Sequence, residues 1–348
     1  MERNMVSVLL VSVDALKPEF VFEQERLGIS LPNISKYFVE NGTFAGGGVQ
    51  SVFPTFTYPC HQSIITGTNP ATHGIYNNGI FDPLGEHMGA WHWFASRKVE
   101  NLWEAAGKHG YLSASVAFPT SVAAGGDFIA PEFWWDGTEL DSRFIDAMSV
   151  PQGMILEMEK DIGRYAGGLD LTEAGDRQRY RAAMWVLDHK IAPRTKERPF
   201  FMSAYFASFD EMAHQYGVYS KEAAHAIEAI DRMLGDLVER VHSMTDDRAV
   251  VCVVSDHGTL DNRYNIRPNV KLREAGLITT DGNGRGTDWR AWSQRAGGMS
   301  EIRLKNGQDE DAGKRLAQVM KELSSDPAFG ILEAGPGAGH REGRFPSG

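Results

Sequence analysis

The chain has 348 residues, of which 42% are hydrophobic and 10% aromatic, so it can fold around a large core. Its formal net charge of −11 argues against nucleic acid as a general partner, because phosphate backbones require a basic surface. Two cysteines, Cys60 and Cys252, exclude a disulfide scaffold, and no apolar run approaches membrane-spanning length. If Met1 is the true start we expect a cytoplasmic protein, since residues 5–13 indicate a strand and not a signal peptide.

The first predicted strand covers residues 6–14, where a nearly continuous apolar run ends in Asp14. Such a run is typical of a parallel strand that is buried on both faces of a sheet. In open α/β sheets ligands bind at the carboxyl ends of the strands, so Asp14 is well placed for chemistry. The alternative is that Asp14 caps the segment that follows.

A second strand is predicted at 49–53, and a helix at 60–66 with Pro59 in its first turn. Thr57 would then lie where a strand leads into a helix, a place at which free backbone N–H groups attract anions. Its hydroxyl is therefore either a helix N-cap or a nucleophile.

Strand and helix patterns alternate along the rest of the chain. Strands are predicted at 111–118, 198–206 and 249–255, and amphipathic helices at 102–109, 176–190, 220–244 and 311–324. This alternation predicts an α/β fold with a doubly wound, mainly parallel sheet and helices on both faces. Residues 121–142 are predicted to form a long loop, and residues 262–306 break the alternation like a small inserted cap.

Two pairs of polar side chains follow predicted strands. In one helical turn, Asp210 and His214 would share a face suited to binding one ion. Asp256 and His257 are adjacent, so either the chain bends there or only one of them binds. Oxygen and imidazole ligands without thiolates suit Zn²⁺ or Mn²⁺. Two such ions roughly 3.5–4 Å apart would serve a phosphoryl transfer.

Together these motifs resemble those of the nucleotide pyrophosphatase/phosphodiesterases, a family of the alkaline phosphatase superfamily. The resemblance extends in order over about the whole chain. The matching stretches are LLVSVDALKP with Asp14, FPTFTYP with Thr57, TGTNPATHGIYNN ending at Asn78, DxxxHQYG from Asp210 to Gly217, and SDHG with Asp256 and His257.

The resemblance implies an alkaline-phosphatase-like fold and two divalent ions, with zinc as the expected metal. It also implies that Thr57 is the nucleophile and that Asn78 donates a hydrogen bond to a phosphoryl oxygen. Tyr58 would be near the place where the family stacks an aromatic ring on a nucleobase. The implied ligands are Asp14, Thr57, Asp256 and His257 for one ion, and Asp210 and His214 for the other.

The sequence departs from the family pattern in two places. Cys60 replaces an Asn at a position that is not a ligand, so we interpret Cys60 as a packing residue. The family completes its second metal site with a His in a late Gly-His-Gly-like turn, whereas the late His here, His340, matches that context only in part. We therefore interpret residues 1–348 as a single catalytic domain, with an insertion at 262–306, that is truncated before the last metal-ligand segment. The second metal site is then incomplete unless His340 contributes.

The leading hypothesis is a metal-dependent hydrolase of phosphodiester or pyrophosphate bonds in small, nucleotide-like substrates, acting through a phospho-threonine intermediate. The alternatives are a phosphomonoesterase or phosphonate hydrolase of the same superfamily, or a truncated, non-catalytic protein that binds a nucleotide or metal. A threonine at position 57 argues against the sulfatase branch, whose nucleophile is a modified Cys or Ser. These alternatives, and the oligomeric state, stay open at the level of sequence.

Overall fold

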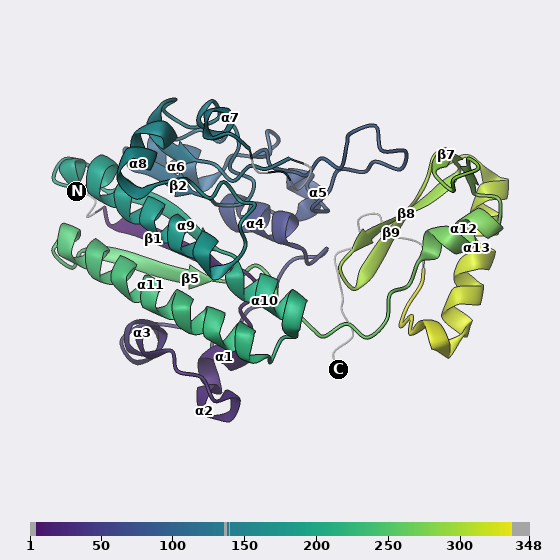
Figure 1. The fold of residues 1–348 in the computed structure, drawn as a ribbon, viewed down its shortest axis with the longest axis horizontal. Coiled ribbons are helices and arrows are strands. Elements are labelled where there is room, and N and C mark those ends of the chain that lie inside the picture. Colours follow the sequence, from purple (N-terminus) through teal and green to yellow (C-terminus); the bar gives the residue numbers. More distant parts are fainter. Residues whose placement is uncertain (1–4, 136–137, 139, 336–348) are drawn as a thin grey trace. The chain divides into compact units, whose positions relative to one another are not determined.

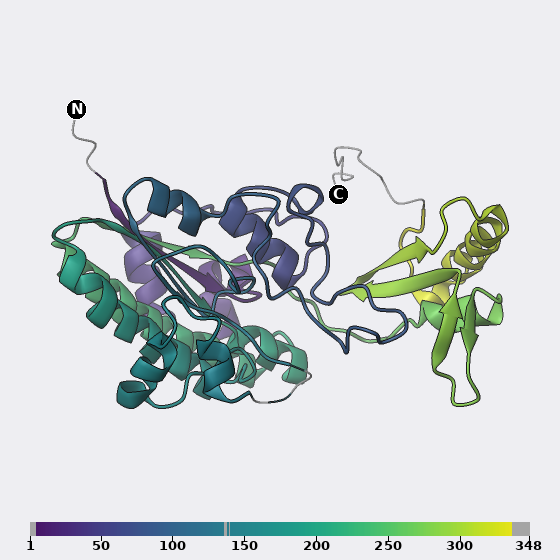
Figure 2. The same ribbon diagram turned by 90° about the horizontal axis from the view of Figure 1, so that it is seen from above.

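The computed structural model describes residues 5–135, 138 and 140–335 and divides the chain into two compact units (Figures 1 and 2). Unit 1 contains the described residues up to Ile80 and from Ala90 to Asp261. Unit 2 contains Phe81–Gly89 and the described residues from Asn262 onward. All the described residues of the predicted site belong to unit 1.

In the described part of unit 1, five strands form one sheet in the order β3-β2-β4-β1-β5, and every neighbouring pair is parallel. The predicted parallel sheet is thereby confirmed. Its strands are β1 (Ser7–Val13), β2 (Leu112–Val116), β3 (Phe128–Ala130), β4 (Phe200–Phe206) and β5 (Ala249–Val254).

The described helices of unit 1 are α1 (Pro18–Phe22), α2 (Gln24–Leu27), α3 (Pro32–Ile34), η1 (Ser35–Glu40), α4 (Thr57–Thr66), α5 (Pro70–His73), α6 (Leu102–Lys108), α7 (Ser142–Asp146), α8 (Met154–Ile162), α9 (Glu173–Val186), η2 (Leu187–Ile191), η3 (Ala192–Arg194), α10 (Ser208–Tyr216) and α11 (Lys221–Thr245). Three of them, α6, α9 and α11, lie where the amphipathic patterns predicted them, and the others range from single turns to helices of 10 residues.

Helices cover both faces of the sheet, as expected for a parallel sheet whose strands are mainly apolar. Successive side chains of a strand point to opposite faces, and β1 divides its residues accordingly. Leu9 and Val11 belong to the core beneath α9 and α11, whereas Leu10 packs into the core with Ile65 of α4 and Trp103 of α6. Figure 2 shows α9 and α11 on one side of the sheet and α4 and α6 on the other.

Two local predictions are wrong. Residues 49–53 form no strand, and the side chains of Val49 and Phe53 are 84% and 58% exposed. A strand needs a neighbour for its backbone groups, and this segment pairs with no strand in the described chain. The predicted loop at 121–142 contains β3, which pairs with β2 through three residues and is too short to give a periodic signal.

A buried carboxylate in α9 holds the start of α10, the helix that carries Asp210. Asp176 accepts hydrogen bonds from the backbone N–H groups of Ala207 and Ser208, both at 2.9 Å. It also pairs with Arg179 at 3.0 Å, and the two side chains are 0% and 1% exposed. Asp176 thus acts as an N-terminal cap supplied from another helix, since Ala207 has no side-chain oxygen of its own.

Replacing Asp176 by alanine is expected to lower the free energy of unfolding by about 3–5 kcal/mol, because it leaves the Arg179 guanidinium buried without its carboxylate. Denaturant unfolding followed by circular dichroism measures the loss. The matched control is Glu173→Ala in the same helix, where the carboxylate pairs with the largely exposed Arg177 and contributes much less. Equal unfolding midpoints for the two variants would contradict the capping role of Asp176.

Unit 2 has a small core of its own. Its elements are α12 (Pro268–Glu274), β6 (Ile278–Thr280), β7 (Gly286–Trp289), β8 (Ala291–Ala296), β9 (Met299–Leu304), α13 (Glu310–Ser325) and η4 (Pro327–Phe329). The strands form two antiparallel pairs, β6 with β7 and β8 with β9. The predicted insertion at 262–306 thus lies within a unit that also takes in α13 and the loop 81–89, whose Phe81 ring packs 5.4 Å from that of Trp289.

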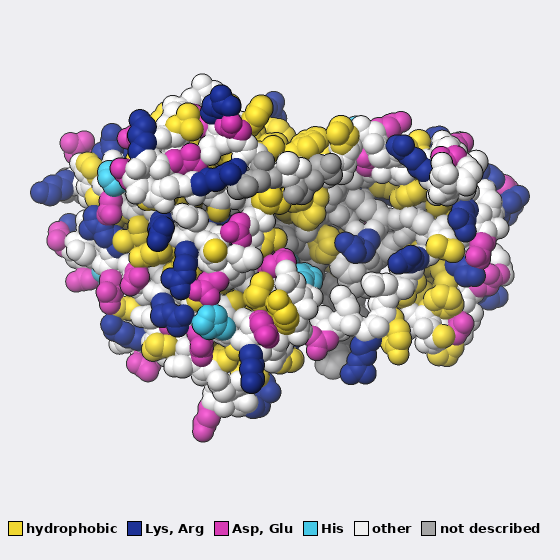
Figure 3. Space-filling view, in the orientation of Figure 1, with side chains coloured by type: hydrophobic (Ala, Val, Ile, Leu, Met, Phe, Trp, Pro, Cys, Tyr) yellow, Lys and Arg dark blue, Asp and Glu magenta, His cyan; other side chains and the backbone are white. Residues whose placement is uncertain are grey.

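Along the described residues, no helix combines the length and the apolar character needed to cross a membrane. On the face drawn in Figure 3, Lys and Arg side chains are interspersed with Asp and Glu side chains and form no basic stripe. This agrees with the acidic net charge.

Candidate active site

Three of the predicted ligands meet beyond the carboxyl ends of β1 and β5. Asp14 directly follows β1, and Asp256 and His257 follow β5, which pairs with β1 in parallel. His257 Nε2 lies 3.5 Å from Asp14 Oδ1 and 3.2 Å from Asp256 Oδ2. The chain bends at Asp256, so both members of the adjacent pair reach the same point. Asp14 is not a helix cap, since the residue before α1 is Lys17.

The orientation of the His257 ring leaves an electron pair directed at the two carboxylates. Its Nδ1 lies 3.0 Å from the carbonyl oxygen of Gly258, which can only accept, so Nδ1 carries the hydrogen and Nε2 does not. Asp14 Oδ1 and Asp256 Oδ2 are buried, and neither has a hydrogen-bond partner among the described residues. Three acceptor atoms therefore face one another, an arrangement that fits a divalent cation.

The pKa values of Asp14 and Asp256 show that both carboxyl groups resist ionisation when no cation lies between them. Burial raises the pKa of Asp14 well above its usual range, and the neighbouring charge of Asp256 raises it further. Burial likewise raises the pKa of Asp256 to about 7. A cation bound between the carboxylates would reverse both shifts, because it favours their charged forms.

Thr57 is the first residue of α4, and Phe56 before it occupies the N-cap position. The capping interpretation of Thr57 is therefore wrong. Its Oγ1 instead lies 3.3 Å from His257 Nε2, so the hydroxyl borders the carboxylate cluster. A hydroxyl at a helix N-terminus beside a metal-type site is suited to attack an anionic phosphoryl group.

Asn78 and Tyr58 are connected to the first turn of α4 through different contacts. Asn78 Oδ1 accepts the backbone N–H of Tyr58 at 2.9 Å, which leaves the amide NH₂ as the group that can donate to a ligand. Tyr58 is 2% exposed, its ring packs against Trp91, and its hydroxyl donates to Glu132 at 2.8 Å. The Tyr58 ring thus has no exposed face on which a nucleobase could stack in this structure.

Asp210 and His214 occupy one face of α10, at the predicted helical spacing. His214 Nε2 lies 3.2 Å from Asp210 Oδ2, and this hydrogen bond raises the pKa of His214. Asp210 Oδ1 is buried and has no hydrogen-bond partner among the described residues. The charge of Asp210 also raises the pKa values of Asp14 and Asp256, so the two ligand sets lie within electrostatic reach. The predicted contributor His340 lies outside the described residues.

Sequence analysis missed three residues that shape the site. Ala15 adopts a left-handed conformation, with φ 57°, and directs its N–H to Asp256 Oδ1 at 3.1 Å. Tyr205 donates its hydroxyl to Asp14 Oδ2 at 2.5 Å from the neighbouring strand β4. His61 of α4 is fully buried near Asp256. The one available signal was the hydroxyl of Tyr205 within the apolar run of β4.

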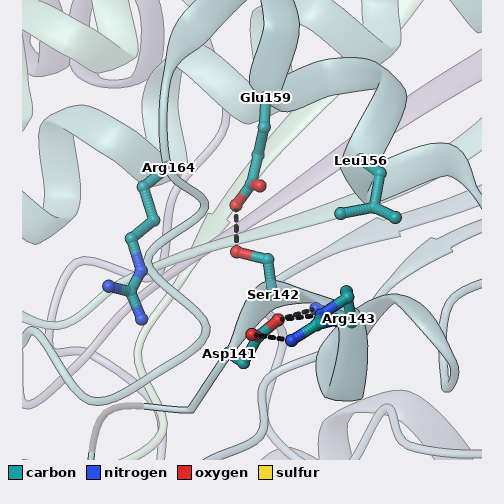
Figure 4. Close-up of a pocket in the computed structure, with 6 residues that line it drawn as sticks. All are labelled: Asp141, Ser142, Arg143, Leu156, Glu159 and Arg164. Carbon is teal, nitrogen blue, oxygen red and sulfur yellow. Dashed lines mark hydrogen bonds and ion pairs between the residues drawn. The ribbon is translucent and has the colours of Figure 1, made fainter.

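A separate pocket of unit 1 belongs to α7, α8 and the segments beside them (Figure 4). Its charged groups are largely satisfied by one another: Asp141 pairs with Arg143 at 2.7 Å, and Ser142 donates to Glu159 at 2.6 Å. None of the predicted site residues lines it. This pocket is therefore distinct from the strand-end cluster and lacks its metal-ligand character.

Several known proteins are similar to this chain in sequence or in fold. The chain is 27% identical over 259 residues to ectonucleotide pyrophosphatase/phosphodiesterase family member 1 of Homo sapiens, covering 72% of this chain and 23% of that protein. It is 25% identical over 253 residues to the human bis(5'-adenosyl)-triphosphatase ENPP4, covering 72% of this chain and 47% of that protein. The chain thus spans from about a quarter to about half the length of these curated relatives.

Among solved structures, murine ectonucleotide pyrophosphatase/phosphodiesterase 5 matches with a TM-score of 0.55 at 17% identity, over 90% of this chain and 70% of that one. An inactive threonine-to-alanine variant of the same protein, in complex with AMP, matches with a TM-score of 0.57 over 94% of this chain and 75% of that one. At 17% identity this likeness establishes the fold. Residues 8–338 match the family described as type I phosphodiesterase / nucleotide pyrophosphatase, and the chain belongs to that family.

Proposed function

We propose that this protein hydrolyses phosphodiester or pyrophosphate bonds of nucleotide-like substrates with the help of two divalent cations, zinc being the expected metal. The observation that carries the proposal is the meeting of the Thr57 hydroxyl with three acceptor atoms, from Asp14, Asp256 and His257. Family membership supports the reaction class, and the two relatives are named as a pyrophosphatase/phosphodiesterase and a bis(5'-adenosyl)-triphosphatase.

Each cation would be held by a distinct set of side chains. Asp14, Asp256, His257 and the Thr57 hydroxyl would hold one, and Asp210 and His214 the other. When bound, the cations supply positive charge that lowers the pKa of a nearby hydroxyl and stabilises negative charge on phosphoryl oxygens. The first set would draw all four of its ligands from unit 1, whereas the second would have two protein ligands among the described residues.

The chain's own groups then account for a two-step reaction. Thr57 Oγ1 attacks phosphorus and loses its proton, and the leaving-group oxygen departs with the electrons of the broken P–O bond and takes up one proton in exchange. Water next attacks the phospho-threonine, which restores the hydroxyl and releases the phosphate product. Throughout, the Asn78 NH₂ group and the N-terminus of α4 can donate hydrogen bonds to phosphoryl oxygens.

The test is a comparison of hydrolysis rates for a bis(nitrophenyl) phosphodiester and the matching monoester, in chelator-treated protein with and without added zinc. We expect zinc-dependent turnover with kcat/KM higher for the diester. Preference for the monoester would favour the phosphomonoesterase alternative. Absence of turnover together with tight zinc binding would favour the non-catalytic alternative, and absence of both would refute the proposal.

A further inference from the structure

The buried side chain of His61 connects three segments that build the proposed site. His61 lies in α4, one turn after Thr57, and is 0% exposed. Its Nδ1 lies 2.8 Å from the backbone oxygen of Thr57 and 3.4 Å from Asp256 Oδ2. Its Nε2 lies 2.9 Å from the hydroxyl of Ser12, which belongs to β1, the strand that leads into Asp14. One imidazole thus touches α4, β1 and the segment after β5.

The partners of His61 determine where its hydrogen lies. A carbonyl oxygen and a carboxylate can only accept, so Nδ1 carries the hydrogen in the neutral ring. Nε2 therefore accepts the hydrogen of the Ser12 hydroxyl. This arrangement turns the N–H edge of the ring toward Asp256 Oδ2, an oxygen with no hydrogen-bond partner among the described residues.

Aromatic rings fix the orientation of the imidazole. Phe118 and Tyr205 meet it edge-on, with ring centroids at 5.0 and 5.2 Å. Tyr205 also donates its hydroxyl to Asp14, so the same packing reaches a second proposed ligand. His61 contacts the backbone oxygen of Thr57 and Oδ2 of Asp256, and none of its described contacts is to the Thr57 hydroxyl, so His61 acts through these residues.

We propose that His61 is a positioning residue, which holds the first turn of α4 and the Asp256 carboxylate in register so that the Thr57 hydroxyl borders the metal ligands. The inference rests on the proposed function. Groups that orient metal ligands commonly change metal affinity or activity by 10–100-fold when they are removed. The reaction rate also falls by about 100-fold when a nucleophile is displaced by about 1 Å from its productive position.

The chain offers a matched control in His73, which is 2% exposed and follows the same helix. Its Nε2 lies 3.0 Å from the hydroxyl of Ser63 in α4, and its Nδ1 accepts the N–H of Ile75. His73 is as buried and as well bonded as His61 but contacts none of the proposed site residues among the described interactions. Its loss should weaken packing without misaligning Thr57.

The experiment compares His61→Leu, His61→Asn and His73→Leu, measuring kcat and KM for the nitrophenyl diester, zinc affinity, and folding by circular dichroism. We expect His61→Leu to lower kcat by about 10–100-fold, with a weaker zinc affinity and a KM changed by less than about threefold. His61→Asn places an N–H near the position of Nδ1 and should recover most of the kcat. His73→Leu should keep the wild-type kcat when folded.

Several outcomes would overturn the positioning role. They are wild-type kcat and zinc affinity in His61→Leu, no recovery in His61→Asn, or an equal loss of kcat in His73→Leu. Should His61→Leu fail to fold, Ser12→Ala carries the test: it frees Nε2 and is expected to lower kcat several-fold, and an unchanged kcat refutes the proposal. If the wild type hydrolyses no phosphate ester, the proposed function fails, and the zinc affinities alone decide whether His61 orients Asp256.

Discussion

Thr57→Ala is expected to lower kcat by on the order of 10⁴-fold or more, because removing the nucleophile of a covalent mechanism removes the step itself. The fold should survive. Thr57 is half-buried, it is not the N-cap of α4, and its hydroxyl makes one described contact, at 3.3 Å to His257. We expect the free energy of unfolding to change by about 1 kcal/mol or less. Turnover of the diester and denaturant unfolding measure the two effects.

The control for this variant is Thr55→Ala. Thr55 is an exposed threonine two residues earlier, and its hydroxyl donates to the backbone oxygen of Val52 at 2.9 Å. It should leave kcat unchanged, whereas Thr57→Ser should retain part of the activity because it keeps a hydroxyl. Substantial hydrolysis by carefully purified Thr57→Ala would remove Thr57 from the role of nucleophile.

Asp256→Asn is expected to weaken zinc binding by on the order of 10²-fold or more and to lower activity with it, since it replaces a charged ligand by a neutral amide. The amide oxygen can still accept the N–H of Ala15, so the local backbone should be kept. Zinc titration with a competing chelator measures the affinity. Asp261→Asn is the control, because Asp261 accepts the N–H of Val218 and contacts none of the predicted ligands among the described interactions. Wild-type zinc affinity in Asp256→Asn would make Asp256 a structural residue.

The same carboxylate predicts how the metal-free protein responds to pH. Folding raises the pKa of Asp256 from 3.8 to about 7, so the native state binds more protons than the unfolded state between these values. The contribution of Asp256 to the stability of the metal-free protein is therefore fully present below about pH 4. It is lost as the pH rises through about 7. Asp256→Asn should flatten that dependence. Unfolding curves at pH 5 and pH 8 in a chelator provide the measurement.

The sequence was sufficient to predict the strands and helices whose hydrophobic pattern is strong within a short segment. The apolar runs before Asp14 and Asp256 predicted β1 and β5, and their parallel pairing brings the two carboxylates together. The spacing of Asp210 and His214 predicted their contact within one helical turn of α10. These cases succeed because periodicity and strand ends are properties of short segments.

The features that the sequence did not predict depend on contacts between distant segments, and such contacts leave no pattern within a short stretch of sequence. The apolar residues at 49–53 resemble a strand, yet they find no partner strand in the described chain. The acidic cap of α10 comes from Asp176, in a different helix. The left-handed turn at Ala15 is stabilised where its N–H meets Asp256, at the far end of unit 1's sequence. Ala15 has no β-branch and therefore tolerates the left-handed conformation, but no local sequence pattern predicts it.

The central position of β1 has a consequence for how the protein is made. Val8 pairs with Phe201 on one side and Ser7 with Ala249 on the other, so both edges of β1 are covered by strands that the ribosome adds much later. Until then the nascent chain carries an apolar segment with two unpaired edges, the kind of segment that associates with other chains. Synthesis must reach β5 before β1 is enclosed. Chaperone protection of the nascent N-terminal segment would therefore bear directly on the yield of folded protein.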